Sequence, residues 1–172
     1  MRYFRLLMVP ALFLLCFPAQ AQTVTFTRDD LDYTIQLPTT AWQAVTRLDI
    51  HRHVEFVNGH DYRNGYLRLR KKLVPMGTSA LELFQYDERW ELQSLPGYVA
   101  CSNGNGTNLQ GQLNGSAFAY EYILNGRPMD GRIYYLRANA RIFYVLHFTV
   151  ASEKLRELRP QMDFIASSFR IK

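Results

Sequence analysis

Residues 48–73, LDIHRHVEFVNGHDYRNGYLRLRKKL, have the pattern of a β-hairpin. Apolar and polar residues alternate on both sides of Asn58-Gly59, a pair that strongly favours a tight turn between strands. A two-residue loop there makes the numbers of paired residues sum to 117, and a four-residue loop makes them sum to 119. Either odd sum predicts one apolar face, made of Leu48, Ile50, Val54, Phe56, Leu67, Leu69 and Leu73. The opposite face then carries His51, His53, Glu55, Tyr66, Arg68, Arg70 and Lys72.

That opposite face is the first candidate binding site. Basic side chains recur at every second residue of the second strand, beside two histidines of the first strand, in the set His51, His53, Tyr66, Arg68, Arg70 and Lys72. A row of this kind attracts acidic proteins, lipid headgroups or anionic polymers, although most such rows are ordinary solvated sheet faces. His51, His53 and Glu55 also suit zinc or copper. Because the neighbouring arginines repel a cation, we expect no metal and no cofactor.

The first 21 residues have the pattern of a secretory signal peptide. Arg2 and Arg5 precede an apolar run of about a dozen residues, and Ala19-Gln20-Ala21 is a typical cleavage sequence. The run is shorter than the roughly 20 residues that span a bilayer. We therefore expect a mature chain that begins at Gln22, forms a single domain over 22–172, has no transmembrane segment and is periplasmic or secreted.

Net charge and cysteine content bear on the kind of partner and on the possible disulfide bonds. Loss of the signal peptide lowers the net charge from +5 to +3, which does not favour nucleic acid as a partner. Cys101 is then the one cysteine left, so no internal disulfide is available. We expect its thiol to be buried, as small apolar residues usually are, with an intermolecular disulfide as the alternative.

A helix is predicted from Ser79, where the sequence Ser-Ala-Leu-Glu fits a capping box, to Pro96-Gly97. Its apolar residues form two stripes. One stripe contains Leu83, Tyr86 and Trp90, and the opposite one contains Leu81, Phe84, Leu92 and Leu95. Since a surface helix buries one stripe, either a loop covers the other or the stripe with Leu83, Tyr86 and Trp90 contacts a partner.

The other elements give the fold class. Strands are predicted near 24–28, 33–37, 109–113, 117–124, 132–136 and 142–150, and Trp42 is expected to close one end of the core. Ser152 is predicted to cap a last helix with one apolar stripe, kinked or restarted at Pro160, before a short strand at 169–171. This order predicts an α+β domain in which an antiparallel sheet lies between helices, an α/β/α sandwich.

The layout resembles the PsbP-like superfamily. The similarity rests on Tyr33-Thr34-Ile35-Gln36-Leu37-Pro38 with Trp42 near the start, a helix from Ser79, and Ile165-Ala166-Ser167-Ser168-Phe169-Arg170 near the end. The resemblance implies an antiparallel sheet flanked by helices and a non-catalytic role in binding another protein. It carries over no active-site residue, because the family has no shared catalytic motif.

Catalytic motifs are not found in the sequence. There is no Gly-x-Ser-x-Gly, and Gly104-Asn105-Gly106 lacks the third glycine of a phosphate-binding loop. We expect an exported, non-enzymatic binding or accessory protein of the cell envelope, whose partner is another envelope protein. An anionic lipid headgroup or a cell-wall polymer is the alternative partner.

Two other functions stay open. One is a carrier of a small apolar or anionic ligand between sheet and helix, and the other is a hydrolase or metal enzyme with an unfamiliar site. A deep pocket lined by Tyr120, Tyr122 and Trp90 favours a carrier, whereas an exposed Trp90 on a shallow surface favours a protein partner.

Overall fold

The computed structural model describes residues 22–38, 41–45, 54–101, 106–109, 111 and 113–172. The predicted signal peptide and the positions 48–53, with His51 and His53, lie outside the described residues. The described strands of the larger sheet are β3 (Trp42–Val45), β4 (Val54–Asn58), β5 (Tyr66–Leu73), β6 (Val99–Ala100), β7 (Thr107–Leu109), β8 (Gly115–Leu124), β9 (Arg127–Arg137) and β10 (Ile142–Ala151).

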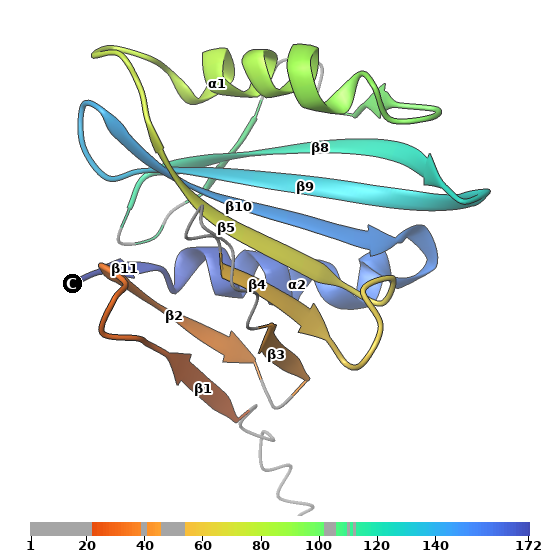
Figure 1. The fold of residues 1–172 in the computed structure, drawn as a ribbon, viewed down its shortest axis with the longest axis horizontal. Coiled ribbons are helices and arrows are strands. Elements are labelled where there is room, and N and C mark those ends of the chain that lie inside the picture. The colour runs from red at the N-terminus through yellow and green to blue at the C-terminus, as the bar shows by residue number, and fades with distance from the viewer. Residues whose placement is uncertain (1–21, 39–40, 46–53, 102–105, 110, 112) are drawn as a thin grey trace, which may run out of the picture.

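This sheet is antiparallel and separates two helical layers. Its strands follow the order β3-β4-β5-β10-β9-β8-β6, and β7 pairs with β8. Helix α1 (Ala80–Asp87) and a π-helical turn, η1 (Glu88–Leu92), lie on one face, and α2 (Leu155–Ser167) lies on the other. Figure 1 shows α1 above the sheet and α2 below it. The predicted α/β/α arrangement is confirmed.

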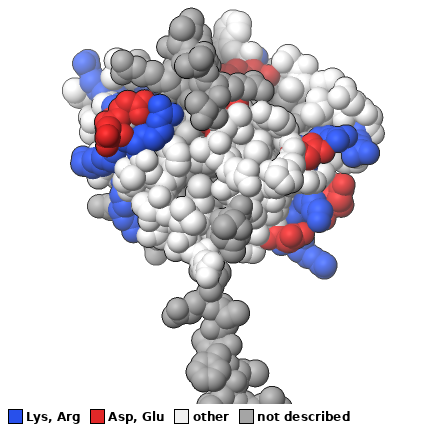
Figure 2. Space-filling model, turned by 60° about the horizontal axis from the view of Figure 1, so that its bottom comes forward, with Lys and Arg blue, Asp and Glu red and all other residues white. Residues whose placement is uncertain are grey.

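A smaller sheet lies on the α2 side. It has the order β1-β2-β11, with β1 at Thr23–Phe26, β2 at Tyr33–Pro38 and β11 at Arg170–Ile171. Strands were predicted near 24–28, 33–37 and 169–171, and all three are present in this sheet. The strands β1, β2 and β3 carry no charged residue, and the face shown in Figure 2 has its charged side chains mainly at the margins.

The hairpin of β4 and β5 keeps the predicted faces but has a longer loop. Val54 pairs with Leu69 and Phe56 with Leu67, so the paired numbers sum to 123, and the predicted sums of 117 and 119 are wrong. The Asn58 N–H donates to the Gly65 carbonyl at 2.8 Å, and this bond closes the wider loop. Because 123 is also odd, the apolar side chains still share one face.

The prediction that Leu73 belongs to the buried apolar face is wrong. Leu73 was expected in the core, but its side chain is 80% exposed, whereas Leu67 and Leu69 are buried. Leu73 lies beyond Val54–Leu69, the last described pair of β4 with β5. At that end of β5, therefore, an apolar side chain faces solvent.

Trp42 and α2 close the lower core. Trp42 is buried, and its indole Nε1–H donates to Gln161 Oε1 at 2.9 Å, as expected for a residue at the core end. Ser152 does not cap α2; it begins a short 3₁₀ helix, η2 (Ser152–Lys154), and Lys154 is the N-terminal flanking residue of α2. Helix α2 is also continuous through Pro160, so it does not restart there.

Candidate functional site

Helix α1 begins where the sequence predicted. The Ser79 side chain accepts from the Glu82 N–H at 3.1 Å, and the Glu82 carboxylate accepts from the Ser79 N–H at 2.6 Å. This reciprocal pair satisfies two backbone donors that a helix start leaves free. The pKa of Glu82 is lowered by these contacts with Ser79.

The two predicted stripes are wrong in their membership. Leu83, assigned to the stripe with Tyr86 and Trp90, is buried, and Leu81 from the other stripe is exposed. The buried face consists of Leu83, Phe84, Asp87 and Leu92. A carboxylate lies in its middle, and the π-helical turn from Glu88 changes the angular spacing of the residues that follow.

Asp87 joins the helix to the sheet. Its side chain has 0% exposure. It accepts a hydrogen bond from the Tyr135 hydroxyl at 2.8 Å and one from Arg70 Nη2 at 3.3 Å. The Lys72 ammonium also forms an ion pair with it. A buried carboxylate is retained when it is paired and hydrogen-bonded, and both conditions hold here.

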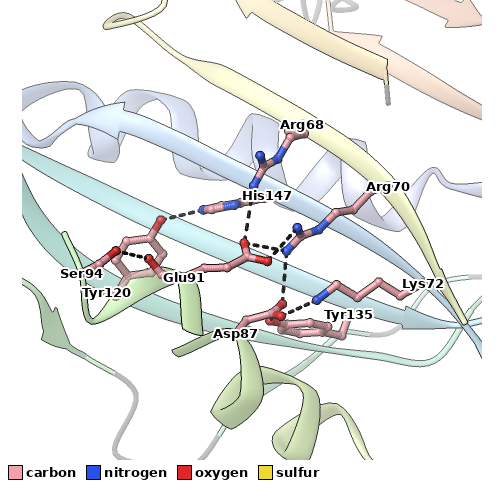
Figure 3. Close-up of polar contacts among 9 residues, drawn as sticks. All are labelled: Arg68, Arg70, Lys72, Asp87, Glu91, Ser94, Tyr120, Tyr135 and His147. Carbon is pink, nitrogen blue, oxygen red and sulfur yellow. Dashed lines mark hydrogen bonds and ion pairs between the residues drawn. The ribbon is translucent and has the colours of Figure 1, made fainter. Parts of the chain in front are cut away.

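Glu91 is the second acidic residue that contacts the basic side chains of β5. Its two oxygens accept from Arg70 Nη1 at 3.0 Å and Nη2 at 3.1 Å, a bidentate arrangement. Arg68 Nη2 lies 3.7 Å from the same carboxylate. Partial burial opposes ionisation of Glu91, but the hydrogen bond from Arg70 and the charges of Arg70, Lys72 and Arg68 lower its pKa. Figure 3 shows these side chains converging from β5 and the helix.

A buried histidine lies beside this ion-pair network. His147 of β10 is directly opposite Arg68 in the ladder, and its Nε2 is 2.6 Å from the Tyr120 hydroxyl. Burial first, and then the nearby charges of Arg68 and Arg70, lower the pKa of His147 to about 3. The imidazole is therefore neutral at ordinary pH and serves as a hydrogen-bonding partner for Tyr120.

The predicted basic face of β5 is thus mostly covered by the helix and paired with its carboxylates, and is not an open, solvated surface. Tyr66, Arg68, Arg70 and Lys72 do share one side of β5, but α1 and η1 cover much of it. The Arg70 side chain is 12% exposed, the Lys72 side chain 19% and the Arg68 side chain 31%. Asp87 and Glu91 were not recognised as their partners. Their four-residue spacing on the helix was the available signal.

Exposed aromatic rings line the helix above this network. Tyr86 is 59% exposed and Trp90 is 67% exposed, and their ring centroids are 6.4 Å apart. The Lys72 ammonium lies 5.9 Å from the Tyr86 ring centroid. We call the surface formed by Arg68, Lys72, Tyr86 and Trp90 the α1–β5 flank. It joins the predicted basic face to the exposed part of the predicted stripe.

A hollow continues this flank toward the end of β5. Its volume is about 450 Å³, and it is lined by Lys72, Leu73, Val74, Pro75, Thr78, Glu82, Leu83 and Tyr86. The exposed Leu73 lies at its margin. Tyr120 and Tyr122, proposed as the lining of a carrier pocket, are both buried, and each lies in the aromatic core under α1.

Other candidate chemistry is placed as follows. Cys101 is exposed, contrary to expectation. Partial desolvation of its thiol and the nearby Glu121 carboxylate raise the pKa of that thiol. Within the part of the chain that the structure describes, no three His, Cys, Asp or Glu residues form a group able to hold a metal. None of the described helices is long and apolar enough to span a membrane.

Comparison with known structures identifies the architecture. The cyanobacterial PsbP protein of Synechocystis superposes with a TM-score of 0.61 at 13% identity, covering 88% of this chain and 94% of its own. The chain has a PsbP-like fold. No family model matches the sequence, and no curated protein matches it.

Two further structures share this PsbP-like fold. LpqN of Mycobacterium tuberculosis, a protein involved in cell envelope biogenesis, has a TM-score of 0.56 at 15% identity, with 88% of this chain and 91% of LpqN covered. A Bacteroides thetaiotaomicron protein has a TM-score of 0.57 at 12% identity, with 86% and 48% covered. The resemblance inferred from the sequence is confirmed as a likeness of fold.

Proposed function

We propose that this PsbP-like chain is an exported, non-enzymatic accessory protein of the cell envelope that binds another envelope protein through the α1–β5 flank. The observation that carries this proposal is the exposure of Tyr86 and Trp90 side by side on a helix that buried ion pairs fix to the sheet. Exposed Trp and Tyr on a rigid support are the residues that contribute most to protein interfaces.

The fixed backbone strengthens this interpretation. A partner that binds a preformed surface orders fewer side chains and loses less entropy than one that binds a mobile segment. Asp87 of α1 and Glu91 of η1 form ion pairs with Arg70 and Lys72 of β5. These contacts fix the helical backbone that carries Tyr86 and Trp90 to the sheet.

The sequence and the relatives are consistent with an envelope location. The pattern of residues 1–21 is typical of a signal peptide. LpqN, a protein with the same fold, is involved in cell envelope biogenesis. Together they support export and an envelope partner for this chain.

The test compares protein capture by surface variants in intact cells. Tagged wild-type protein and the double variant Tyr86→Ser with Trp90→Ser are crosslinked in cells, purified and analysed by quantitative mass spectrometry. Val24→Ser with Ile171→Ser is the matched control, because those side chains are 51% and 38% exposed on the small sheet. We expect one envelope protein to be lost with the first double variant and kept with the control. Equal capture by all three proteins contradicts the proposal.

A carrier function is the second candidate. A hollow of about 580 Å³ lies between β5 and the segment that connects β1 to β2. It is lined by Asp30, Leu31, Asp32, Tyr33, Leu69, Lys71, Leu73 and Ile142. Its volume is in the usual range of small-molecule sites. Native mass spectrometry of protein purified from its own cells tests this function, because a carrier is expected to retain a bound small molecule.

A further inference from the structure

Strand β1 is an open edge of the small sheet. In the order β1-β2-β11, its one neighbour among the described strands is β2, and Figure 1 shows it at the outer margin of the fold. An edge strand exposes backbone N–H and C=O groups that can pair with another strand. Proteins commonly protect such an edge with a charge, a proline or a bulge. The strand Thr23–Phe26 contains no charge and no proline, and its register with β2 is continuous.

The hydrogen bonds of β2 show which of its backbone groups point to β1. The Gln36 N–H donates to Ser168 Oγ at 2.9 Å, and the same hydroxyl lies 3.3 Å from the Gln36 carbonyl oxygen. The backbone of Gln36 therefore points away from β1. Because successive residues of a strand point their backbone groups to opposite sides, the two neighbours of Gln36 point to β1.

The outward backbone groups of β1 follow from this alternation. The two neighbours of Gln36 are paired with Val24 and Phe26, so these two residues of β1 use their backbone groups in the ladder with β2. The N–H and C=O groups of Thr23 and Thr25 consequently point to the outer edge. Both threonines are exposed.

Val24 faces the core side of the small sheet without being covered there. It lies directly opposite Leu37, so the two side chains are on the same face. Leu37 is 4% exposed, whereas Val24 is 51% exposed. The core side is therefore open at the same edge that carries the outward backbone groups.

The absence of charge on this edge favours a second copy of the chain as its partner. Across a two-fold axis the same surface meets itself, so like charges on an edge repel each other. Strands β1, β2 and β3 carry no charged residue, and Figure 2 shows charged side chains mainly at the margins of this face. Arg28, the first charged residue after β1, is paired with Asp30 at 2.8 Å. The edge is thus complementary to its own copy.

We propose that two copies of this chain pair through their β1 edges, antiparallel and related by a two-fold axis at Val24. Thr23 of each copy lies opposite Thr25 of the other, and both pairs exchange backbone N–H···O=C bonds. Among the antiparallel two-fold registers of β1, this one pairs the outward groups of both threonines within the strand. Val24 meets its own copy, which covers the open core side, and the two three-stranded sheets form one six-stranded sheet.

This dimer is independent of the α1–β5 flank. Helix α1 lies on the other side of the larger sheet from β1, so pairing leaves the flank of each copy open (Figure 1). A four-residue edge is small for a stable interface, so we expect a reversible dimer. Two open flanks on one dimer strengthen binding to a clustered partner through effective concentration.

The first test reverses charge at the two-fold axis. Sedimentation velocity of the exported protein, from about 5 μM to about 1 mM, measures the dimer Kd. Val24→Lys and Val24→Glu each place like charges opposite each other, and we expect either to raise the Kd at least about tenfold. An equal mixture of the two variants is expected to dimerise again, because lysine then faces glutamate. Gln36→Lys is the matched control, since Gln36 is exposed on the central strand of the same sheet.

The second test removes a backbone donor and keeps the fold. Thr25→Pro deletes an N–H that faces outward, and proline is tolerated at such positions of edge strands. We expect this variant to be monomeric with a urea midpoint close to that of the wild type. Thr25→Val keeps both the N–H and the shape of the side chain, and is expected to dimerise.

The third test reports the register directly. Opposed residues of a non-hydrogen-bonded pair have Cα atoms about 4.5 Å apart, which a disulfide can bridge. With Cys101 replaced by serine, Val24→Cys is expected to form a disulfide-linked dimer under mild oxidation. Thr25→Cys is the matched control, because position 25 meets position 23 of the other copy and is expected to give little linked product.

Several results overturn the inference. A monomer at every concentration contradicts it, as does a dimer that persists in both Val24→Lys and Thr25→Pro. Equal linkage of Val24→Cys and Thr25→Cys contradicts the register. A monomer that loses an envelope protein with Thr25→Pro assigns the edge to a strand of that protein. In each case capture that depends on Tyr86 and Trp90 is unaffected, so the proposed function stands or falls separately.

Discussion

The Glu91 carboxylate accepts two hydrogen bonds from the Arg70 guanidinium, at 3.0 and 3.1 Å, and these bonds fix the π-helical turn η1 to strand β5. Trp90 is the neighbouring residue on that turn and is 67% exposed. Trp90 is therefore the most exposed large aromatic residue in the described part of the chain, and the residue next to it is bound to β5 through two hydrogen bonds. This relationship makes the α1–β5 flank a rigid surface.

Asp87→Asn is predicted to destabilise the protein strongly. The change keeps the shape of the side chain but removes the carboxylate that pairs with Lys72 and leaves Arg70 with Glu91 alone, which costs about 3 kcal/mol of unfolding free energy. Urea unfolding measures this loss. Asp163→Asn is the matched control, because Asp163 also contacts an arginine and a tyrosine but is 41% exposed. A control that loses as much as Asp87→Asn contradicts the assigned role.

The acid sensitivity of the fold is predicted to depend on His147. Its pKa is about 3 in the folded protein, against 6.5 as the ordinary value, so the unfolded chain binds more protons between these two pH values. Stability from this residue is complete above pH 6.5 and falls by roughly 1.4 kcal/mol per pH unit on acidification toward pH 3.

His147→Gln provides the comparison, because glutamine keeps a polar contact for Tyr120 and does not titrate. Urea unfolding between pH 7.5 and pH 4.5 is expected to show a shallower pH slope for this variant. Parallel slopes for the variant and the wild type disprove the assignment, whatever the absolute stabilities are.

The aromatic residues of the flank are predicted to be dispensable for folding. Trp90→Ser and Tyr86→Ser remove exposed side chains, so the unfolding free energy changes by less than about 0.5 kcal/mol. Phe84→Ala removes a buried ring that stacks on Phe118 at 4.4 Å and is expected to cost about 3–5 kcal/mol. Thermal or urea unfolding distinguishes the two classes. A large loss at Trp90 means that the ring supports the fold instead of a partner.

Gly131 is predicted to be intolerant of a side chain. A Cβ there lies 2.0 Å from Tyr120 Cζ, directly across the ladder, so alanine forces the Tyr120 ring away from His147. Gly131→Ala is expected to cost about 1–3 kcal/mol. Combination with Tyr120→Ala removes the clash, so the two losses are expected to be less than additive in urea unfolding. Full additivity of the two losses contradicts the predicted clash.

The sequence predicted the faces of the hairpin because face membership needs only the parity of the register. Val54, Phe56, Leu67 and Leu69 are buried together, although the loop is longer than Asn58-Gly59 suggested. Asn-Gly favours a tight turn locally, but the bond from Asn58 to Gly65 closes a wider loop. Loop length was therefore the part that local turn chemistry could not determine.

The helix shows where periodicity alone was insufficient. Leu83 and Tyr86 have similar places in an apolar pattern, yet one is buried and the other is exposed. The difference depends on Asp87, which is buried because two cations of β5 meet it there. Pairs of residues distant in sequence determine such a position, and a helical period contains no information about them.

Site-specific photocrosslinking at position 90 in living cells tests the central claim most directly. A benzophenone amino acid is placed at Trp90 and, in separate cells, at Val24, which is 51% exposed on the small sheet. We predict one discrete crosslinked product from position 90, an envelope protein identified by mass spectrometry, and none of the same mass from position 24. Absence of a product at position 90, or the same product from both positions, contradicts binding through the α1–β5 flank.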